Sequence, residues 1–231
     1  MDETTTRAYI LLHNVSKKHN VGTLTRIATA FNVTTIVLTG NAHYNVFGCQ
    51  GASAYAKFVH KRTLEDAVRW LKEDCACEIV GVEIDESAVP LPDARHAWCG
   101  EQPNVRSRAF FMGNEGHGLS EREISLCDKL VYIPQYGVGS TASLNVAVAA
   151  GVVLSAFAEA AAFAQCNKQG AKFDVAERPR RTQTRGFAED DEEREMRIQA
   201  RRLAREKAAH GDDDDDIDNP PPSLDTLFSE S

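Results

Sequence analysis

The chain is 231 residues long, is 42% hydrophobic and carries a net charge of −8, which allows one or two globular domains with an apolar core. Residues 1–166 contain 14 Lys and Arg against 17 Asp and Glu, and residues 167–231 contain 12 against 17. Because neither half is basic, composition alone does not indicate nucleic-acid binding, and any such function must rest on local clusters.

No apolar run approaches the ~18–20 residues that a membrane-spanning helix needs, and residues 1–7 have neither a signal-peptide nor a transit-peptide pattern. We therefore expect a soluble intracellular protein, cytoplasmic in the first instance, with the nucleus left open. The six cysteines are scattered, and only Cys75 and Cys77 lie close together. We expect free thiols and no metal site, because no second pair completes a zinc-binding set.

The first elements alternate between strand and helix. Residues 7–13 (RAYILLH) form a short, nearly continuous apolar run, which is typical of a buried parallel strand. In residues 20–31, apolar side chains recur at helical spacing, which predicts an amphipathic helix with Asn20 near its cap. Residues 33–38 (VTTIVL) predict the second strand. The strand–helix–strand order implies a parallel sheet.

The middle of the chain is less regular. Residues 39–54 are rich in Gly, Asn and Ser and predict a loop. An amphipathic helix over residues 63–74 and a strand over residues 78–84 follow. Residues 85–107 are polar and contain three prolines, so we predict irregular structure there.

A glycine-rich loop follows the predicted strand at residues 108–112 (RAFFM). Its glycine order, G-x-x-G-x-G, is neither the dinucleotide-binding nor the phosphate-loop pattern, and no Lys follows it. We therefore discount a nucleoside triphosphatase and a nicotinamide-dependent enzyme. Ser120 and Glu123 form a capping box, which predicts a helix start, and residues 130–133 predict another strand.

A second glycine-rich loop follows that strand. Pro134 ends strand pairing, and the glycines at positions 137 and 139 allow the backbone to bend. The hydroxyl residues at positions 140, 141 and 143 are candidate N-caps. The helix predicted from Leu144 to Phe163 is apolar or small at almost every position, so we expect it to be buried nearly all round.

Asn145 is the polar exception just inside this predicted helix. A buried amide needs hydrogen-bond partners, so Asn145 either ties down the loop above it or, with Ser143, lines a site at the helix N-terminus. The residues leave both interpretations open. Loops that follow parallel strands gather at the carboxyl edge of a sheet, which adds Glu115, in the preceding glycine loop, to the candidate site residues.

Three stretches together, residues 20–26 (NVGTLTR), 112–120 (MGNEGHGLS) and 133–146 (IPQYGVGSTASLNV), resemble the TrmH (SpoU) branch of the SPOUT methyltransferases. The resemblance implies an α/β fold, a parallel sheet with helices on both faces and a C-terminal trefoil knot. It also implies transfer of a methyl group from S-adenosylmethionine to a ribose 2′-hydroxyl of tRNA or rRNA, with tRNA favoured. The implied enzyme is a homodimer that uses neither a metal nor a membrane.

The resemblance further implies the site residues. Catalytic roles are implied for Arg26, Asn20, Glu115, Ser143 and Asn145. Contacts with S-adenosylmethionine are implied for Met112, Gly113, Asn114, Gly116, Ile133, Gln135, Gly137, Ser143 and Leu144. Because a guanidinium stays protonated and is a poor general base, we interpret Arg26 as a stabiliser of the oxyanion and a phosphate clamp.

We place the end of the methyltransferase domain at residue 166, because apolar content falls beyond Phe163. Residues 167–231 predict a charged, largely disordered tail with four arginines between positions 178 and 185 and a possible helix over residues 189–209. The alternative function is a non-catalytic RNA-binding or assembly factor that keeps the fold. The joint presence of the candidate catalytic residues favours the enzyme.

Overall fold

The computed structural model describes residues 5–14, 18–40, 49–114, 117–139 and 141–177. The chain divides into two units, residues 1–189 and 190–231, and all of the described residues belong to the first unit. The domain boundary expected at residue 166 stays a prediction.

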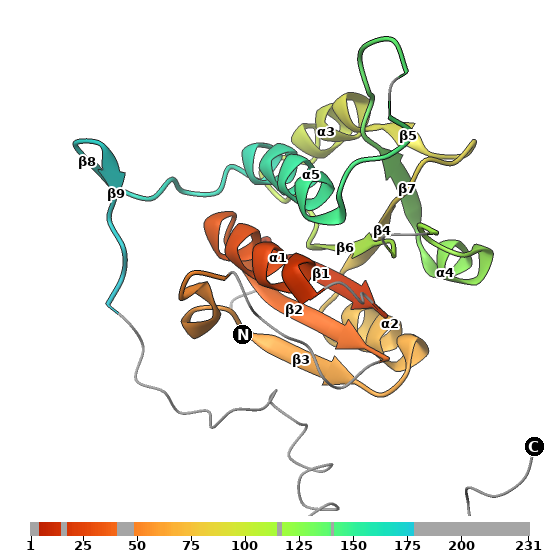
Figure 1. Cartoon of the computed structure of the whole chain (residues 1–231), viewed down its shortest axis with the longest axis horizontal. Helices are drawn as coiled ribbons and strands as arrows, with labels where there is room; N and C mark the ends of the chain where they lie inside the picture. The colour runs from red at the N-terminus through yellow and green to blue at the C-terminus, as the bar shows by residue number, and fades with distance from the viewer. Residues whose placement is uncertain (1–4, 15–17, 41–48, 115–116, 140, 178–231) are drawn as a thin grey trace, which may run out of the picture. The chain divides into compact units, whose positions relative to one another are not determined.

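A seven-stranded parallel sheet forms the centre of this unit (Figure 1). Its strand order is β3-β2-β1-β6-β4-β7-β5. The strands are β1 (Ala8–His13), β2 (Val33–Thr39), β3 (Phe58–Lys61), β4 (Glu78–Val82), β5 (Val89–Pro90), β6 (Arg108–Met112) and β7 (Lys129–Tyr132). Every adjacent pair runs parallel, so the carboxyl ends of all seven strands lie at one edge.

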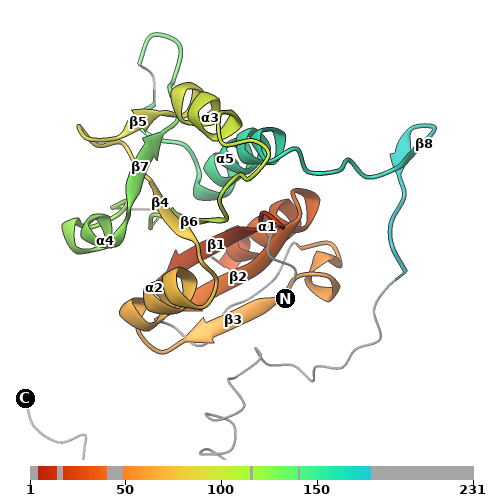
Figure 2. The same ribbon diagram turned by 180° about the vertical axis from the view of Figure 1, so that it is seen from behind.

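Helices cover both faces of the sheet, as Figures 1 and 2 show from opposite sides. The helical segments are α1 (Lys18–Ala30), the 3-10 turn η1 (Ala52–Ala54), α2 (Leu64–Glu73), α3 (Leu91–Cys99), α4 (Glu121–Leu126) and α5 (Val146–Ala160). Helices α1, α3 and α5 pack on one face, and α2 and α4 pack on the other. The predicted α/β class is therefore confirmed, whereas the trefoil knot stays a prediction.

The central strand β6 is anchored from both faces. Side chains of a strand alternate between faces, and Phe110 packs with the α1, α3 and α5 side while Phe111 packs with the α2 side. The rings of Trp98 and Phe157 meet Phe110 edge-on, with centroids 5.9 and 5.2 Å away. Because every residue of β6 is buried, the loop at its carboxyl end starts from a fixed position.

Two segments differ from the sequence-based predictions. Residues 85–107 are not irregular, because they contain β5 and α3. Pro92 lies in the first turn of α3, where a helix does not need the missing N–H. Strand β3 was not predicted; it is one of the two edge strands, and all four of its residues are only half-buried, so its apolar pattern is weak.

Helix α5 also differs from its prediction. It starts at Val146, and Asn145 is its N-cap rather than an interior residue or one of the hydroxyl candidates. The expectation that it is buried nearly all round is wrong, because Val148 and Val152, one turn apart, are 51% and 39% exposed. A uniformly apolar helix has no periodicity, so the sequence could not indicate the exposed side.

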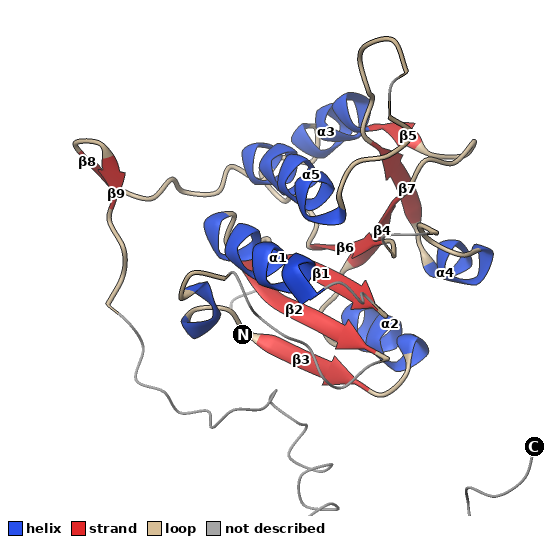
Figure 3. Cartoon of the chain, viewed as in Figure 1, coloured by secondary structure: helices blue, strands red, loops and turns tan. Residues whose placement is uncertain are grey.

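Beyond α5, the described chain forms a short antiparallel hairpin of β8 (Lys168–Gln169) and β9 (Lys172–Phe173) (Figure 3). The arginine cluster and the helix expected over residues 189–209 lie outside the described residues. All six cysteines are free thiols. Across the described ranges, no helix is long and apolar enough to cross a membrane.

Candidate functional site

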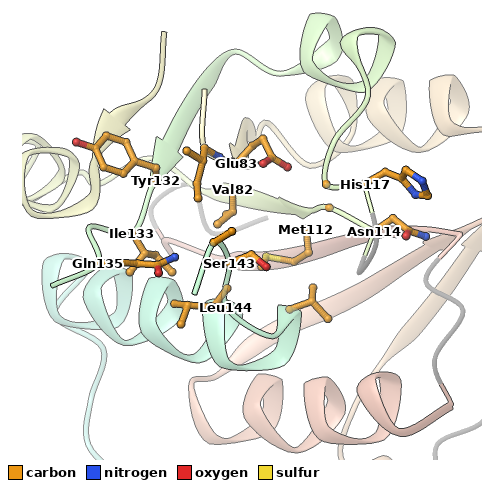
Figure 4. Close-up of a pocket in the computed structure, with 16 residues that line it drawn as sticks. Val82, Glu83, Met112, Asn114, His117, Tyr132, Ile133, Gln135, Ser143 and Leu144 are labelled. Atoms are coloured by element: carbon orange, nitrogen blue, oxygen red, sulfur yellow. Dashed lines mark hydrogen bonds between the residues drawn. The ribbon is translucent and has the colours of Figure 1, made fainter. Parts of the chain in front are cut away.

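A cleft opens at the carboxyl edge of the sheet, where β4, β6 and β7 end (Figure 4). The register pairs Val82 of β4 with Met112 of β6 and with Val131 of β7, so each strand delivers its following loop to the same place. The cleft volume of about 310 Å³ lies in the range of small-molecule sites. Of the predicted site residues, the following line it: Met112, Gly113, Asn114, Ile133, Gln135, Ser143 and Leu144.

The loop after β6 forms one wall of the cleft. The backbones of Asn114 and Gly118 exchange two hydrogen bonds of 3.0 and 2.9 Å, which close the loop on itself. A Cβ on Gly113 would lie 2.7 Å from the carbonyl carbon of Gly118, so only glycine allows the two backbones to approach this closely. The loop then enters α4 through the predicted capping box of Ser120 and Glu123, which is confirmed.

The long loop between β7 and α5 forms the other wall, and Figure 3 shows its course. Gly137 and Gly139 have φ values of +132° and +76°, which glycine adopts without strain. Gly137 itself is not among the residues that line the cleft. Ser143 and Leu144 line it immediately before α5, and Ser143 is exposed, so its hydroxyl is accessible to a ligand.

Asn145 joins the starts of two helices. Its Oδ1 accepts a hydrogen bond of 2.9 Å from the amide of Ala147, and its Nδ2 donates one of 3.1 Å to Oδ1 of Asn20. Asn20 is buried in the first turn of α1. Asn145 does not line the cleft, so the structure favours the interpretation in which it ties down the loop that carries Ser143.

The structure does not bring Arg26 into this cleft. Arg26 lies on α1, six residues after Asn20, with its side chain exposed. Within the described part of the chain, the Arg26 side chain has no ion-pair partner. Glu115 and Gly116 lie outside the described residues. Most of the residues predicted to contact S-adenosylmethionine therefore line the cleft, whereas of the described residues predicted to be catalytic only Ser143 does.

A carboxylate and an imidazole that sequence reasoning missed also line the cleft, on Glu83 and His117. Glu83 directly follows β4, so the same carboxyl-edge argument would have found it if the strand order had been known. Among the described residues lining the cleft, Glu83 is the only carboxylate. Nowhere in the described ranges do three or more His, Cys, Asp or Glu side chains gather as a metal ion would require.

These features define an α/β protein with a ligand cleft between glycine-rich loops at the carboxyl edge of a parallel sheet. The model of the SpoU rRNA methylase family matches residues 7–155. The chain belongs to this family.

Named relatives agree with this assignment. The 23S rRNA (guanosine-2'-O-)-methyltransferase RlmB of Acinetobacter baylyi is 30% identical over 150 residues, which cover 63% of this chain and 56% of that protein. The tRNA (guanosine(18)-2'-O)-methyltransferase of Escherichia coli is 26% identical over 148 residues, which cover 63% and 60%. The chain therefore spans less than two thirds of the length of these relatives.

Solved structures share the fold. The AdoMet-bound rRNA methyltransferase from Sinorhizobium meliloti matches with a TM-score of 0.57 and 24% identity over 69% of this chain and 58% of that one. The TrmH/SpoU tRNA modifying enzyme of A. aeolicus matches with a TM-score of 0.56 and 21% identity over 68% and 77%. At these identities the likeness establishes the fold alone.

Proposed function

We propose that this chain is an S-adenosylmethionine-dependent methyltransferase that modifies a ribose 2′-hydroxyl of RNA. One observation carries the proposal: Met112 after β6, Ile133 after β7 and Ser143 before α5 line a single cleft. Family membership and the 2′-O-methyltransferase names of the relatives support the same reaction. The sequence favours tRNA, whereas these relatives are named for tRNA and for rRNA, so we propose both RNA classes as substrates. We also propose a cytoplasmic location.

The cleft fits S-adenosylmethionine in its chemistry. When bound, this cofactor supplies an electrophilic methyl group on a sulfonium. Val82, Met112 and Leu144 give the cleft apolar walls that suit an adenine ring, and Gln135 adds a side-chain amide. Asn114 and Ser143 add further polar side chains to the lining.

Methyl transfer to a hydroxyl needs in-line placement and stabilisation of the oxygen as its proton leaves. The Arg26 guanidinium is exposed and unpaired within the described part of the chain, so its charge is available to a 2′-oxygen or a phosphate. The Asn20–Asn145 hydrogen bond holds the starts of α1 and α5 together and so fixes Ser143 at the cleft. We also retain Glu115 as a proposed catalytic residue, on the family resemblance alone.

The proposed enzyme is a homodimer. Val148 and Val152 on α5 and Leu144 just before it are all exposed, so an apolar strip runs from the cleft along the helix. Such a strip beside a functional cleft is typical of a protein interface. Val21 and Leu24 of α1 are buried within the chain, so we base the dimer proposal on the strip along α5. Light scattering should give twice the monomer mass of 25.4 kDa; the monomer mass at micromolar protein would contradict it.

Two measurements test the function. Isothermal titration should show binding of S-adenosylmethionine to the purified chain. Incubation with methyl-labelled S-adenosylmethionine and either tRNA or rRNA, followed by digestion to nucleosides, should yield labelled 2′-O-methyl nucleoside from one RNA class. Binding without transfer to either RNA would favour the non-catalytic alternative, and absence of binding would refute the proposal.

A further inference from the structure

A carboxylate at the end of β4 holds the loop that follows β6. The Oε2 atom of Glu83 accepts a hydrogen bond of 2.6 Å from the amide of Leu119, and its Oε1 accepts one of 3.0 Å from the amide of Ile84. Figure 4 shows the Glu83 side chain reaching from β4 toward the loop that carries His117. Glu83 therefore connects the end of β4 to the loop after β6 at the rim of the cleft, through a contact with Leu119 that spans 36 residues of sequence.

Gly118 packs directly against this carboxylate. A Cβ on Gly118 would lie 2.1 Å from Oε2 of Glu83 and 2.7 Å from its carboxyl carbon. Gly118 also closes the loop through its two backbone hydrogen bonds with Asn114, and both residues line the cleft. The position of this wall of the cleft therefore depends on how Glu83 contacts Gly118 and Leu119.

The buried end of the loop needs this acceptor. Leu119 is only 6% exposed and its side chain lies in the core under α2, so its amide would lose a partner without gaining water if Glu83 were removed. Of the cleft-lining residues that the structure describes, none but Glu83 offers a carboxylate to this amide.

We propose that Glu83 is a positioning residue for the cofactor cleft, which holds Gly118 and Leu119, and through them Asn114, in their ligand-binding positions. The inference rests on the proposed function, because it takes the ligand to be S-adenosylmethionine. A loop that occupies its binding position only part of the time lowers the apparent affinity by that fraction. Removal of the anchor should therefore weaken cofactor binding without unfolding the chain.

Two variants of Glu83 separate anchoring from charge in titrations of the full chain with S-adenosylmethionine. Glu83→Leu removes the acceptor and should raise the dissociation constant about tenfold or more, as loss of a hydrogen bond to a charged acceptor does. Glu83→Gln keeps one oxygen for the Leu119 amide and should stay within about threefold of the unmodified chain. Glu86→Leu is the matched control, because Glu86 is exposed three residues on and lies outside the cleft. A Glu83→Gln chain as impaired as Glu83→Leu would overturn the anchoring role.

Amide hydrogen exchange without cofactor gives an independent answer. Exchange in a peptide spanning residues 113–120 should accelerate in Glu83→Leu and stay unchanged in Glu83→Gln and Glu86→Leu. Gly118→Ala, whose Cβ would displace the carboxylate, should give the same local acceleration. Unchanged exchange in both Glu83→Leu and Gly118→Ala would overturn the inference. An unmodified chain that binds no S-adenosylmethionine would refute the proposed function instead, while the exchange result would still decide whether Glu83 holds the loop.

Discussion

The amino ends and the carboxyl ends of the strands, here called the amino edge and the carboxyl edge of the sheet, differ in what they bury. At the amino edge, the fully buried Arg108 of β6 pairs with Glu78 of β4 at 2.8 Å and with Glu101 at 2.5 Å. At the carboxyl edge, Gly113 follows β6 and Glu83 follows β4, and both residues line an open cleft. The same strands therefore carry a closed ionic network at one end and a ligand site at the other.

The Arg108 guanidinium has further partners besides the two carboxylates. The Arg108 guanidinium also donates to the carbonyl of Arg106 at 3.3 Å, and the ring centroids of Trp98 and Phe157 lie 5.2 and 5.7 Å from it. Burial alone would raise the pKa of Glu101, but hydrogen bonds from Arg108 and from the Arg106 amide outweigh burial and lower it. The amino edge therefore satisfies its buried charge within the chain, whereas the carboxyl edge opens into a cleft.

The largest effect on stability should come from Arg108→Met. It removes the buried partner of Glu78 and Glu101, which keep Lys129 and the Arg106 amide respectively, so the cost should not exceed the roughly 3–5 kcal/mol of a fully broken buried pair. Urea unfolding measures this free energy. Arg106→Met, at an exposed neighbour, is the control and should change it by less than about 0.5 kcal/mol. An Arg108→Met chain as stable as the control would mean that the network does not hold this edge.

The pH dependence of that difference has a definite sign. Because the pKa of Glu101 is lowered in the folded chain, its stabilising contribution is present above the unfolded pKa and is lost as the pH falls through the folded value. The gap in unfolding free energy between the unmodified chain and Arg108→Met should therefore narrow on acidification. A gap that widens at low pH would contradict the assigned pairing.

Arg26→Ala should cause the largest effect on activity. Methyl transfer should fall by about 10²–10³, as loss of one oxyanion donor does elsewhere, whereas affinity for S-adenosylmethionine should stay nearly unchanged because Arg26 lies outside the cleft. Arg26→Lys keeps the charge without the planar fork and should recover part of the rate. Single-turnover methylation tests this, with cofactor affinity measured separately. Unimpaired transfer in Arg26→Ala would remove this residue from the mechanism.

Asn145 should have an intermediate effect. Asn145→Ala removes both the N-cap of α5 and the hydrogen bond to Asn20, which together should cost about 1–2 kcal/mol of unfolding free energy. Asn145→Asp keeps the cap acceptor but loses the donor to Asn20, so its unfolding free energy should lie between those of the unmodified chain and Asn145→Ala. A double-mutant cycle with Asn20→Ala should show coupling. Additive losses would mean that the amide pair is unimportant.

Deletion of residues 167–231 should have the smallest effect. The described part of this segment is exposed throughout, so its loss removes little buried surface. The shortened chain should remain folded and bind S-adenosylmethionine as before, by circular dichroism and titration, with RNA affinity weakened at low salt only. Failure to fold would show that the boundary at residue 166 is drawn too early.

The sequence predicted the parts of this fold whose apolar pattern is unambiguous. Strands β1, β2, β6 and β7 were found because they are buried on both faces and read as apolar runs. Helix α3 was missed although Leu91, Ala94 and Trp98 form its buried face, because the surrounding prolines suggested a loop.

The site was predictable only in part. The glycine loops after β6 and β7 were expected to meet at the carboxyl edge, and their residues do line one cleft. Strand order depends on long-range packing that one sequence does not reveal, so the position of β4 between β6 and β7, and with it Glu83, could not be predicted. The cap position of Asn145 was missed because three hydroxyl residues before it compete for that role.

Methyl NMR of the methionines follows cofactor binding at the cleft, because Met112 lines it and is the one methionine of the sequence within the family match at residues 7–155. The chain is labelled with [methyl-13C]methionine, and Met112→Leu assigns the resonance. Unlabelled S-adenosylmethionine is then added. We expect a saturable shift of the Met112 methyl resonance, with those of Met1 and Met196 unchanged. A Met112 resonance that does not move while titration shows cofactor bound would contradict the assignment of this cleft.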